Sequence, residues 1–120
     1  MPDDGFSLFD MVSPTDYRYP MPSLVPYFSE EAFVQYKSRV EAALARVKAR
    51  RGMISQDDAR LIEEASKLVT AAEVYEEERR TNHDIIAQTN VMKRKIDQIA
   101  ERPEKAESAK RAIHWPATSY

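Results

Sequence analysis

Two short clusters of hydrogen-bonding side chains contain the only two histidines of this 120-residue chain. The first cluster is Thr-Asn-His-Asp at residues 81–84, and the second lies within the run His-Trp-Pro-Ala-Thr-Ser-Tyr at residues 114–120. An imidazole can donate or accept a hydrogen bond near neutral pH, and nearby hydroxyl and amide groups can bind the oxygens of an anion. The two clusters therefore suggest a site for a polar or anionic ligand.

Each cluster also has a purely structural interpretation. Thr81 and Asp84 fit the capping-box pattern of a helix start, in which both side chains satisfy free backbone amides. The same helix start would present its amides and its positive dipole end to an anion, with His83 beside them. The second cluster could equally be a frayed chain end. The residues alone leave these alternatives open.

A third cluster is Arg18-Tyr19, within Ser-Pro-Thr-Asp-Tyr-Arg-Tyr-Pro at residues 13–20. A guanidinium can bind a carboxylate or a phosphate through two parallel hydrogen bonds. An arginine packed against tyrosines on the surface is the structural alternative. This cluster is thus a third candidate contact for an anionic group.

The sequence lacks the patterns of several other kinds of site. Cysteine is absent, and the two histidines lie 31 positions apart without the spacing of a metal site. The two glycines stand alone, so no glycine-rich phosphate loop is present, and no nucleophile elbow is visible. We therefore expect no metal site and no glycine-rich phosphate loop.

Composition excludes two classes of partner. The net charge of −2 gives no basic surface for nucleic acid or an anionic membrane. No apolar stretch approaches the roughly 20 residues that cross a bilayer, and the acidic first residues do not resemble a secretory signal. We expect a cytoplasmic protein.

The distribution of proline and glycine predicts an all-α fold. Five of the seven prolines lie within residues 1–26, so residues 1–28 are predicted to form an irregular, proline-rich arm. Apolar residues beyond the arm recur at spacings of three and four, which is typical of helices. About five helices are expected, beginning after Ser29, after Ser55, near residue 70, near Thr81 and at Glu104.

Two of the predicted helices carry apolar stripes. In the first helix, residues at spacings of three and four form one apolar face: Phe33, Tyr36, Val40, Ala43, Leu44 and Val47. In the fourth, a seven-residue repeat suited to packing along another helix comprises Ile85, Thr89, Met92, Ile96 and Ile99. We expect this second stripe to stay partly exposed and to drive self-association. The charged run at residues 76–80 is expected to be a solvated helix face.

Taken in order, the clusters resemble the N-terminal part of the adenylosuccinate lyases, within the fumarase/aspartase superfamily. The resemblance rests on Ser-Pro-x-Asp-x-Arg-Tyr at residues 13–19 and on Arg-x-Thr-Asn-His-Asp at residues 79–84. It ends with Ile-His-x-x-x-Thr-Ser at residues 113–119, where Pro116 departs from the small residue usual in the family. All three motifs occur in the family's order.

The resemblance implies a function and a role for each cluster. Enzymes of this family cleave adenylosuccinate to AMP and fumarate, and release fumarate from the succinylated imidazole-carboxamide ribotide, by β-elimination without a cofactor. By resemblance, Arg18-Tyr19 binds the substrate phosphate, the cluster at residues 81–84 contacts the nucleotide and succinyl parts, and the Thr-Ser pair at residues 118–119 holds a carboxylate. The implied substrate-binding residues are Arg18, Tyr19, Asn82, His83, Asp84, Thr118 and Ser119.

The resemblance also implies that this chain by itself is inactive. The family's general acid and the serine loop that supplies its base occur later in the sequence, and its active sites combine three subunits of a homotetramer. We therefore expect a piece of a longer enzyme, with a helical domain at residues 1–112 and the start of the next region at 113–120. The alternatives are another fumarate-releasing lyase, such as argininosuccinate lyase, and a non-enzymatic helical interaction module.

Overall fold

Helices make up the secondary structure of the computed structural model, which describes residues 8–16 and 18–117. No strand occurs in this part of the chain, which confirms the all-α class. Five longer helices follow the arm, as predicted, and the arm, which was predicted to be irregular, contains three short helices among its described residues. The short ones are η1 (Leu8–Asp10), η2 (Pro22–Leu24) and α1 (Val25–Phe28). The longer ones are α2 (Glu30–Arg50), α3 (Gln56–Ser66), α4 (Ala71–Thr81), α5 (Asp84–Ile99) and α6 (Pro103–Ala112).

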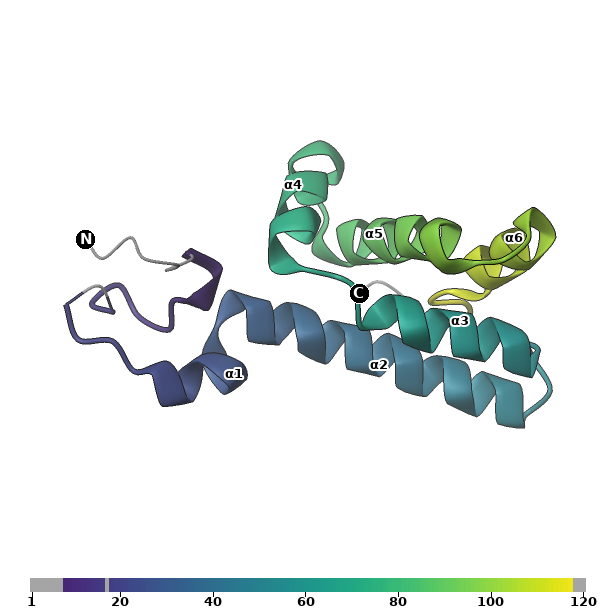
Figure 1. Ribbon diagram of the computed structural model, residues 1–120, viewed down its shortest axis with the longest axis horizontal. Coiled ribbons are helices and arrows are strands. Elements are labelled where there is room, and N and C mark those ends of the chain that lie inside the picture. Colours follow the sequence, from purple (N-terminus) through teal and green to yellow (C-terminus); the bar gives the residue numbers. More distant parts are fainter. Residues whose placement is uncertain (1–7, 17, 118–120) are drawn as a thin grey trace.

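The longest helix, α2, lies along one side of the molecule with α3 beside it (Figure 1). On its other side, α3 packs against α5 and α6, so it forms the middle of the bundle. The arm extends beyond the N-terminal end of α2 (Figure 1). It contacts the bundle through Phe9, whose ring stacks on that of Tyr75 in α4 with centroids 5.4 Å apart.

Local capping sets most of the helix ends. The hydroxyls of Ser29 and Ser55 accept backbone N–H groups at the starts of α2 and α3, as predicted. Thr70 and Glu73 form a full capping box at the start of α4. After α2, Gly52 has a φ of 73°, a left-handed conformation that glycine adopts without a steric penalty. No helix in the described residues is long and apolar enough to cross a membrane.

The apolar face predicted for the first helix is not its buried face. Val40 is 66% exposed, and Phe33 and Val47 are also exposed. The helix instead packs through small side chains, which let the backbones of α2 and α3 approach closely. The buried residues of α2 are Ala32, Val34, Ser38, Glu41, Ala42, Ala45, Lys48 and Ala49. Size and hydrophobicity alone therefore pointed to the wrong side of this helix.

The expectation that the stripe on the fourth helix stays partly exposed holds only at its ends, where Ile85 and Ile99 are half-buried, and is wrong for its centre. Met92 and Ile96 are both 0% exposed, because α5 packs against α3, α4 and α6 within the same chain. The exposed apolar side chains belong instead mainly to the arm, α1 and the outer face of α2. The structural reason for self-association through α5 is thus removed.

The charged run on α4 is only partly a solvated face. Glu77 is buried, and its carboxylate accepts hydrogen bonds from Arg80, from Asn90 and from Arg94. Hydrogen bonds from Arg80 and Asn90 hold the pKa of Glu77 below its usual value. Because Asn90 and Arg94 belong to α5, this one carboxylate joins the two helices.

A second carboxylate, Glu73, joins α4 to α5 through Lys95 at 2.5 Å. Partial burial alone would raise the pKa of Glu73, but hydrogen bonds from Lys95 and Thr70 outweigh it and lower the pKa. Glu73 and Glu77 therefore both stabilise the folded chain in their ionised form.

Acidification is expected to destabilise the chain by protonating Glu73 and Glu77. A carboxylate whose pKa is lower in the folded than in the unfolded chain contributes stability above its ordinary pKa, and this is lost as pH falls through the folded value. Since both pKa values lie below the ordinary 4.5, the loss should begin below about pH 4.5. Thermal melts between pH 7 and pH 3 should show it. Glu77→Gln should flatten the dependence and the exposed Glu76→Gln should not; a Tm independent of pH contradicts the prediction.

Candidate functional site

The turn between α4 and α5 contains the first histidine cluster. Asn82 has a φ of 54°, and its N–H donates to the carbonyl of Glu78, which ends α4 after Thr81. Asparagine tolerates this left-handed conformation better than most residues. The start of α5 is therefore two residues later than a cap at Thr81 would place it, and that part of the prediction is wrong. The Thr81 hydroxyl instead donates to the carbonyl of His83 inside the turn.

His83 is itself the cap of α5. Its Nδ1 accepts the backbone N–H of Ile86 at 3.3 Å, so this nitrogen carries no proton and the ring proton resides on Nε2. Within the described part of the chain, Nε2 makes no hydrogen bond. One imidazole can therefore satisfy the helix end and still donate a hydrogen bond to a ligand.

Asp84 connects the turn to α2. Its carboxylate lies 3.3 Å from the ammonium of Lys37. Partial burial acts to raise the pKa of Asp84, but the hydrogen bond and the charge of Lys37 lower it below its ordinary value. The carboxylate next to His83 is therefore ionised and paired with the ammonium of Lys37.

The second histidine cluster forms another turn, at residues 113–117, and this turn also lies on α2. The Nδ1 of His114 is 2.5 Å from Oε1 of Glu41, and the N–H of Ala117 donates to the His114 carbonyl at 2.7 Å. The ammonium of Lys48 donates to the carbonyls of Ala112 and Trp115. Both Glu41 and Lys48 are buried side chains of α2.

The helix α2 therefore brings the two histidine clusters together. Lys37 contacts the first turn and Glu41 contacts the second, and these two residues are four positions apart. Four residues correspond to about one helical turn, or roughly 6 Å along the axis. Clusters that are 31 positions apart in sequence thus lie on adjacent turns of one helix.

Sequence reasoning did not identify the residues of α2 that hold these turns. A signal was available, because the buried seam repeats at alternating spacings of four and three, and charged residues occupy two of its positions. A charge at a seam position indicates a specific buried partner. The positions of this seam are Val34, Ser38, Glu41, Ala45 and Lys48.

Arg18 and Tyr19 lie apart from the two turns. Their backbone N–H groups donate to the carbonyl of Thr15, and the Tyr19 side chain is 68% exposed. Neither side chain forms a hydrogen bond or an ion pair with the turns within the described ranges. The buried carboxylate of Asp16, which accepts the N–H of Ser13 at 3.0 Å, organises this part of the arm. Of the remaining predicted site residues, Thr118 and Ser119 lie outside the described residues.

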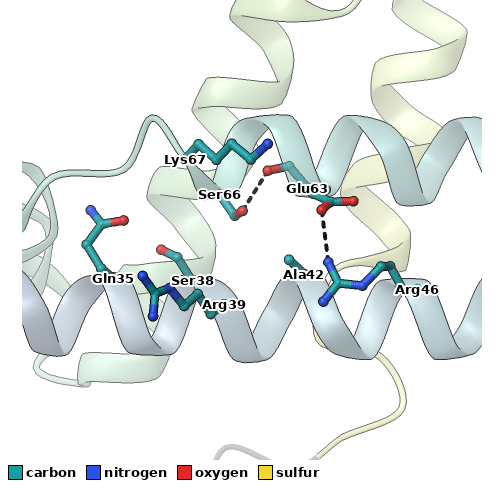
Figure 2. A pocket seen from close by; sticks show the side chains of 8 residues that line it. All are labelled: Gln35, Ser38, Arg39, Ala42, Arg46, Glu63, Ser66 and Lys67. Carbon is teal, nitrogen blue, oxygen red and sulfur yellow. Dashed lines mark hydrogen bonds and ion pairs between the residues drawn. The ribbon is translucent and has the colours of Figure 1, made fainter.

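A separate groove of about 320 Å³ runs between α2 and α3. Arg46 and Glu63 face each other across it at 2.9 Å, and the Ser66 hydroxyl donates to the Glu63 carbonyl (Figure 2). The lining residues are Gln35, Ser38, Arg39, Ala42, Arg46, Glu63, Ser66 and Lys67. None of the predicted site residues lines this groove, so it is distinct from the two turns. No group of three or more potential metal ligands comes together in the described residues.

Comparison with known proteins gives relatives of one kind. The chain is 34% identical over 110 residues to an adenylosuccinate lyase of Methanocaldococcus jannaschii, covering 90% of the chain and 22% of that protein. It is 36% identical over 77 residues to an adenylosuccinate lyase of Archaeoglobus fulgidus and 41% identical over 78 residues to one of Pyrococcus abyssi. These two matches cover 64% and 63% of the chain and 17% of each relative. The chain thus spans about a fifth of the length of these relatives; no family model and no solved structure matches it.

Proposed function

Since the chain is related to adenylosuccinate lyases, we propose that it is the N-terminal part of an enzyme that cleaves adenylosuccinate to AMP and fumarate. The observation that carries the proposal is the 34% identity to one such lyase over 90% of the chain. The joining of both histidine turns on α2 supports it, because this geometry suits a ligand with several anionic groups.

In the proposed reaction, a base removes a proton from the succinyl carbon next to a carboxylate. The carbon–nitrogen bond then breaks, a proton is delivered to the leaving nitrogen, and fumarate and AMP are released. Base and acid would come from segments beyond this chain. The first turn would contribute the Nε2–H of His83, placed to donate to an oxygen on which negative charge develops. Thr118 and Ser119 would bind a carboxylate through their hydroxyls.

The arm would contribute the phosphate contacts. The guanidinium of Arg18 can bind a phosphate through two parallel hydrogen bonds, with the Tyr19 hydroxyl beside it. The exposure of Tyr19 and its separation from the turns of its own chain fit an arm that acts in a site shared between subunits. From the resemblance to adenylosuccinate lyases, we propose a homotetramer, with a nucleotide substrate, as the active form.

A chimera tests this function. The chain is inserted in place of the aligned 110 residues of the Methanocaldococcus jannaschii lyase, and fumarate release from adenylosuccinate is measured. We expect the chimera to release fumarate and the isolated 120-residue chain to release none, because the chain lacks the proposed acid and base. The chimera without the inserted segment is the background control.

Two results would contradict the proposal. Fumarate release by the isolated chain would show that the acid and base lie within it. A chimera that folds and assembles like the parent lyase, but does not cleave adenylosuccinate, would show that this chain does not serve that reaction.

A further inference from the structure

A fully buried lysine is the most unusual charged group of the described residues. Lys48 is 2% exposed, and its ammonium donates to two backbone carbonyls, that of Ala112 at the end of α6 and that of Trp115 in the following turn. Burying an ammonium is costly unless other groups replace its water. The two carbonyls do so, and Glu41, seven residues earlier on the same face of α2, adds an attractive charge. Lys48 therefore fixes two points of the chain around residues 113–117.

The third point of that turn is fixed by Glu41. Glu41 is 6% exposed, and its carboxylate accepts the Nδ1–H of His114 at 2.5 Å. The backbone of His114 has a φ of 64°, which is strained for a residue other than glycine. Such a conformation persists only where its surroundings enforce it. Here Glu41 holds the ring while Lys48 holds the carbonyls on both sides.

The second ring nitrogen of His114 is left without a hydrogen bond among the described residues. This nitrogen, Nε2, is buried and has no hydrogen-bond partner among the described residues, and the same holds for Oε2 of Glu41. With Nδ1 donating to a carboxylate, the proton of the neutral ring lies on Nδ1 and the tautomer is set by Glu41. The hydrogen bond to Glu41 therefore fixes the orientation of the His114 ring.

We infer that Glu41 and Lys48 are positioning residues that fix the 113–117 turn, and with it the ring of His114, beside the first histidine turn. The consequences for catalysis rest on the proposed function, whereas the consequences for the turn do not. Stability alone would not require these charges, because well-packed apolar residues in place of a buried ion pair are often neutral or stabilising. An apolar side chain could fill the same space but could not direct a ring nitrogen or two carbonyls.

The isolated chain provides the first test, by NMR of the His114 ring and of the backbone at residues 113–117. The parent should show the proton of the neutral ring on Nδ1. Glu41→Ala should move it toward Nε2, the preference of free imidazole side chains. Lys48→Met, which keeps the length of the side chain, should shift the signals of residues 113–117 while the other helices stay unchanged. Arg50→Met, at an exposed position of the same helix, should change neither.

The chimera provides the second test, since it measures substrate binding and turnover. Glu41→Gln and Lys48→Met should each lower kcat/KM by about 10- to 100-fold, the usual cost of losing a group that orients a ligand-binding residue. Part of this loss should appear as a higher KM, which lower stability alone would not produce in the folded enzyme. Glu41→Gln keeps the shape of the side chain, so it decides the question if Lys48→Met does not fold.

The outcomes separate the two proposals. Unchanged tautomer and unchanged signals at residues 113–117 in both variants of the isolated chain would overturn the positioning role. Unchanged KM and kcat in both chimera variants would overturn its importance for catalysis. If the unsubstituted chimera is inactive, the proposed function fails, and the NMR measurement still decides whether these residues hold the turn.

Discussion

Replacing His83 by asparagine in the chimeric lyase is expected to lower kcat/KM by about 30- to 1,000-fold. Asparagine is a favoured helix cap, so its side-chain oxygen can replace Nδ1 as the acceptor of the Ile86 N–H. It has no equivalent of the Nε2–H, which we propose as the donor to the substrate. Losing one charged or transition-state hydrogen bond costs roughly 2–4 kcal/mol, which is this range of rates. Steady-state kinetics with adenylosuccinate gives the effect directly.

His83→Ala is the matched control, because it removes both the cap and the donor. It should lower kcat/KM by a similar factor and also lower the unfolding free energy of the isolated chain by about 1 kcal/mol. Thermal melts of the two variants separate these contributions. If the asparagine variant keeps near-normal turnover, His83 is only a helix cap and its proposed contact with the substrate is wrong.

In the isolated chain, Ile96→Ala is expected to cost about 2–5 kcal/mol of unfolding free energy. The side chain of Ile96 is 0% exposed and belongs to the hydrophobic core, so truncating it leaves a cavity and loses buried apolar surface. Val40→Ala should change the free energy by less than about 0.5 kcal/mol, because Val40 lies in solvent although it belongs to the more conspicuous apolar stripe. Urea denaturation measures both values.

This pair of substitutions tests which helix faces form the core. Similar losses for the two variants would mean that the outer face of α2 is covered, either by a second copy or by another part of the chain. A repeat of the measurement at tenfold lower protein concentration would distinguish these two possibilities, since only association depends on concentration.

The helix class and most helix starts could be predicted from the sequence because they depend on neighbouring residues. Ser29 and Ser55 cap their helices through amides three positions away, which a local pattern captures. The buried side of α2 could not be predicted in this way. Periodicity shows that a face exists, but whether Val40 or Ala45 turns inward depends on how closely α3 approaches, and small residues permit the closest contact.

The candidate site was predicted in part. The two histidine clusters were identified, and the structure brings them to the same helix. Their partners were missed because Lys37 and Glu41 are 47 and 73 positions away from the residues they contact. Thr81 was placed at a helix start because its pattern fits one, yet it is the last residue of α4, which ends at the left-handed Asn82. Local sequence patterns thus identified the two histidine clusters, whereas contacts between residues far apart in sequence determine how the clusters are arranged.

The spacing of residues along α2 sets the relative position of the two histidine turns. Lys37, Glu41 and Lys48 fall within about 40° of one another around the helix, because each residue advances by roughly 100°. One residue inserted between Lys37 and Glu41 would leave the contact of Lys37 with the first turn unchanged. It would rotate Glu41 and Lys48 by about 100° around the helix axis, away from the second turn and His114. Substitutions on the outer face of α2 should therefore be tolerated. Insertions or deletions between Lys37 and Lys48 should not be, whereas insertions in the loops before and after α2 should leave these contacts unchanged.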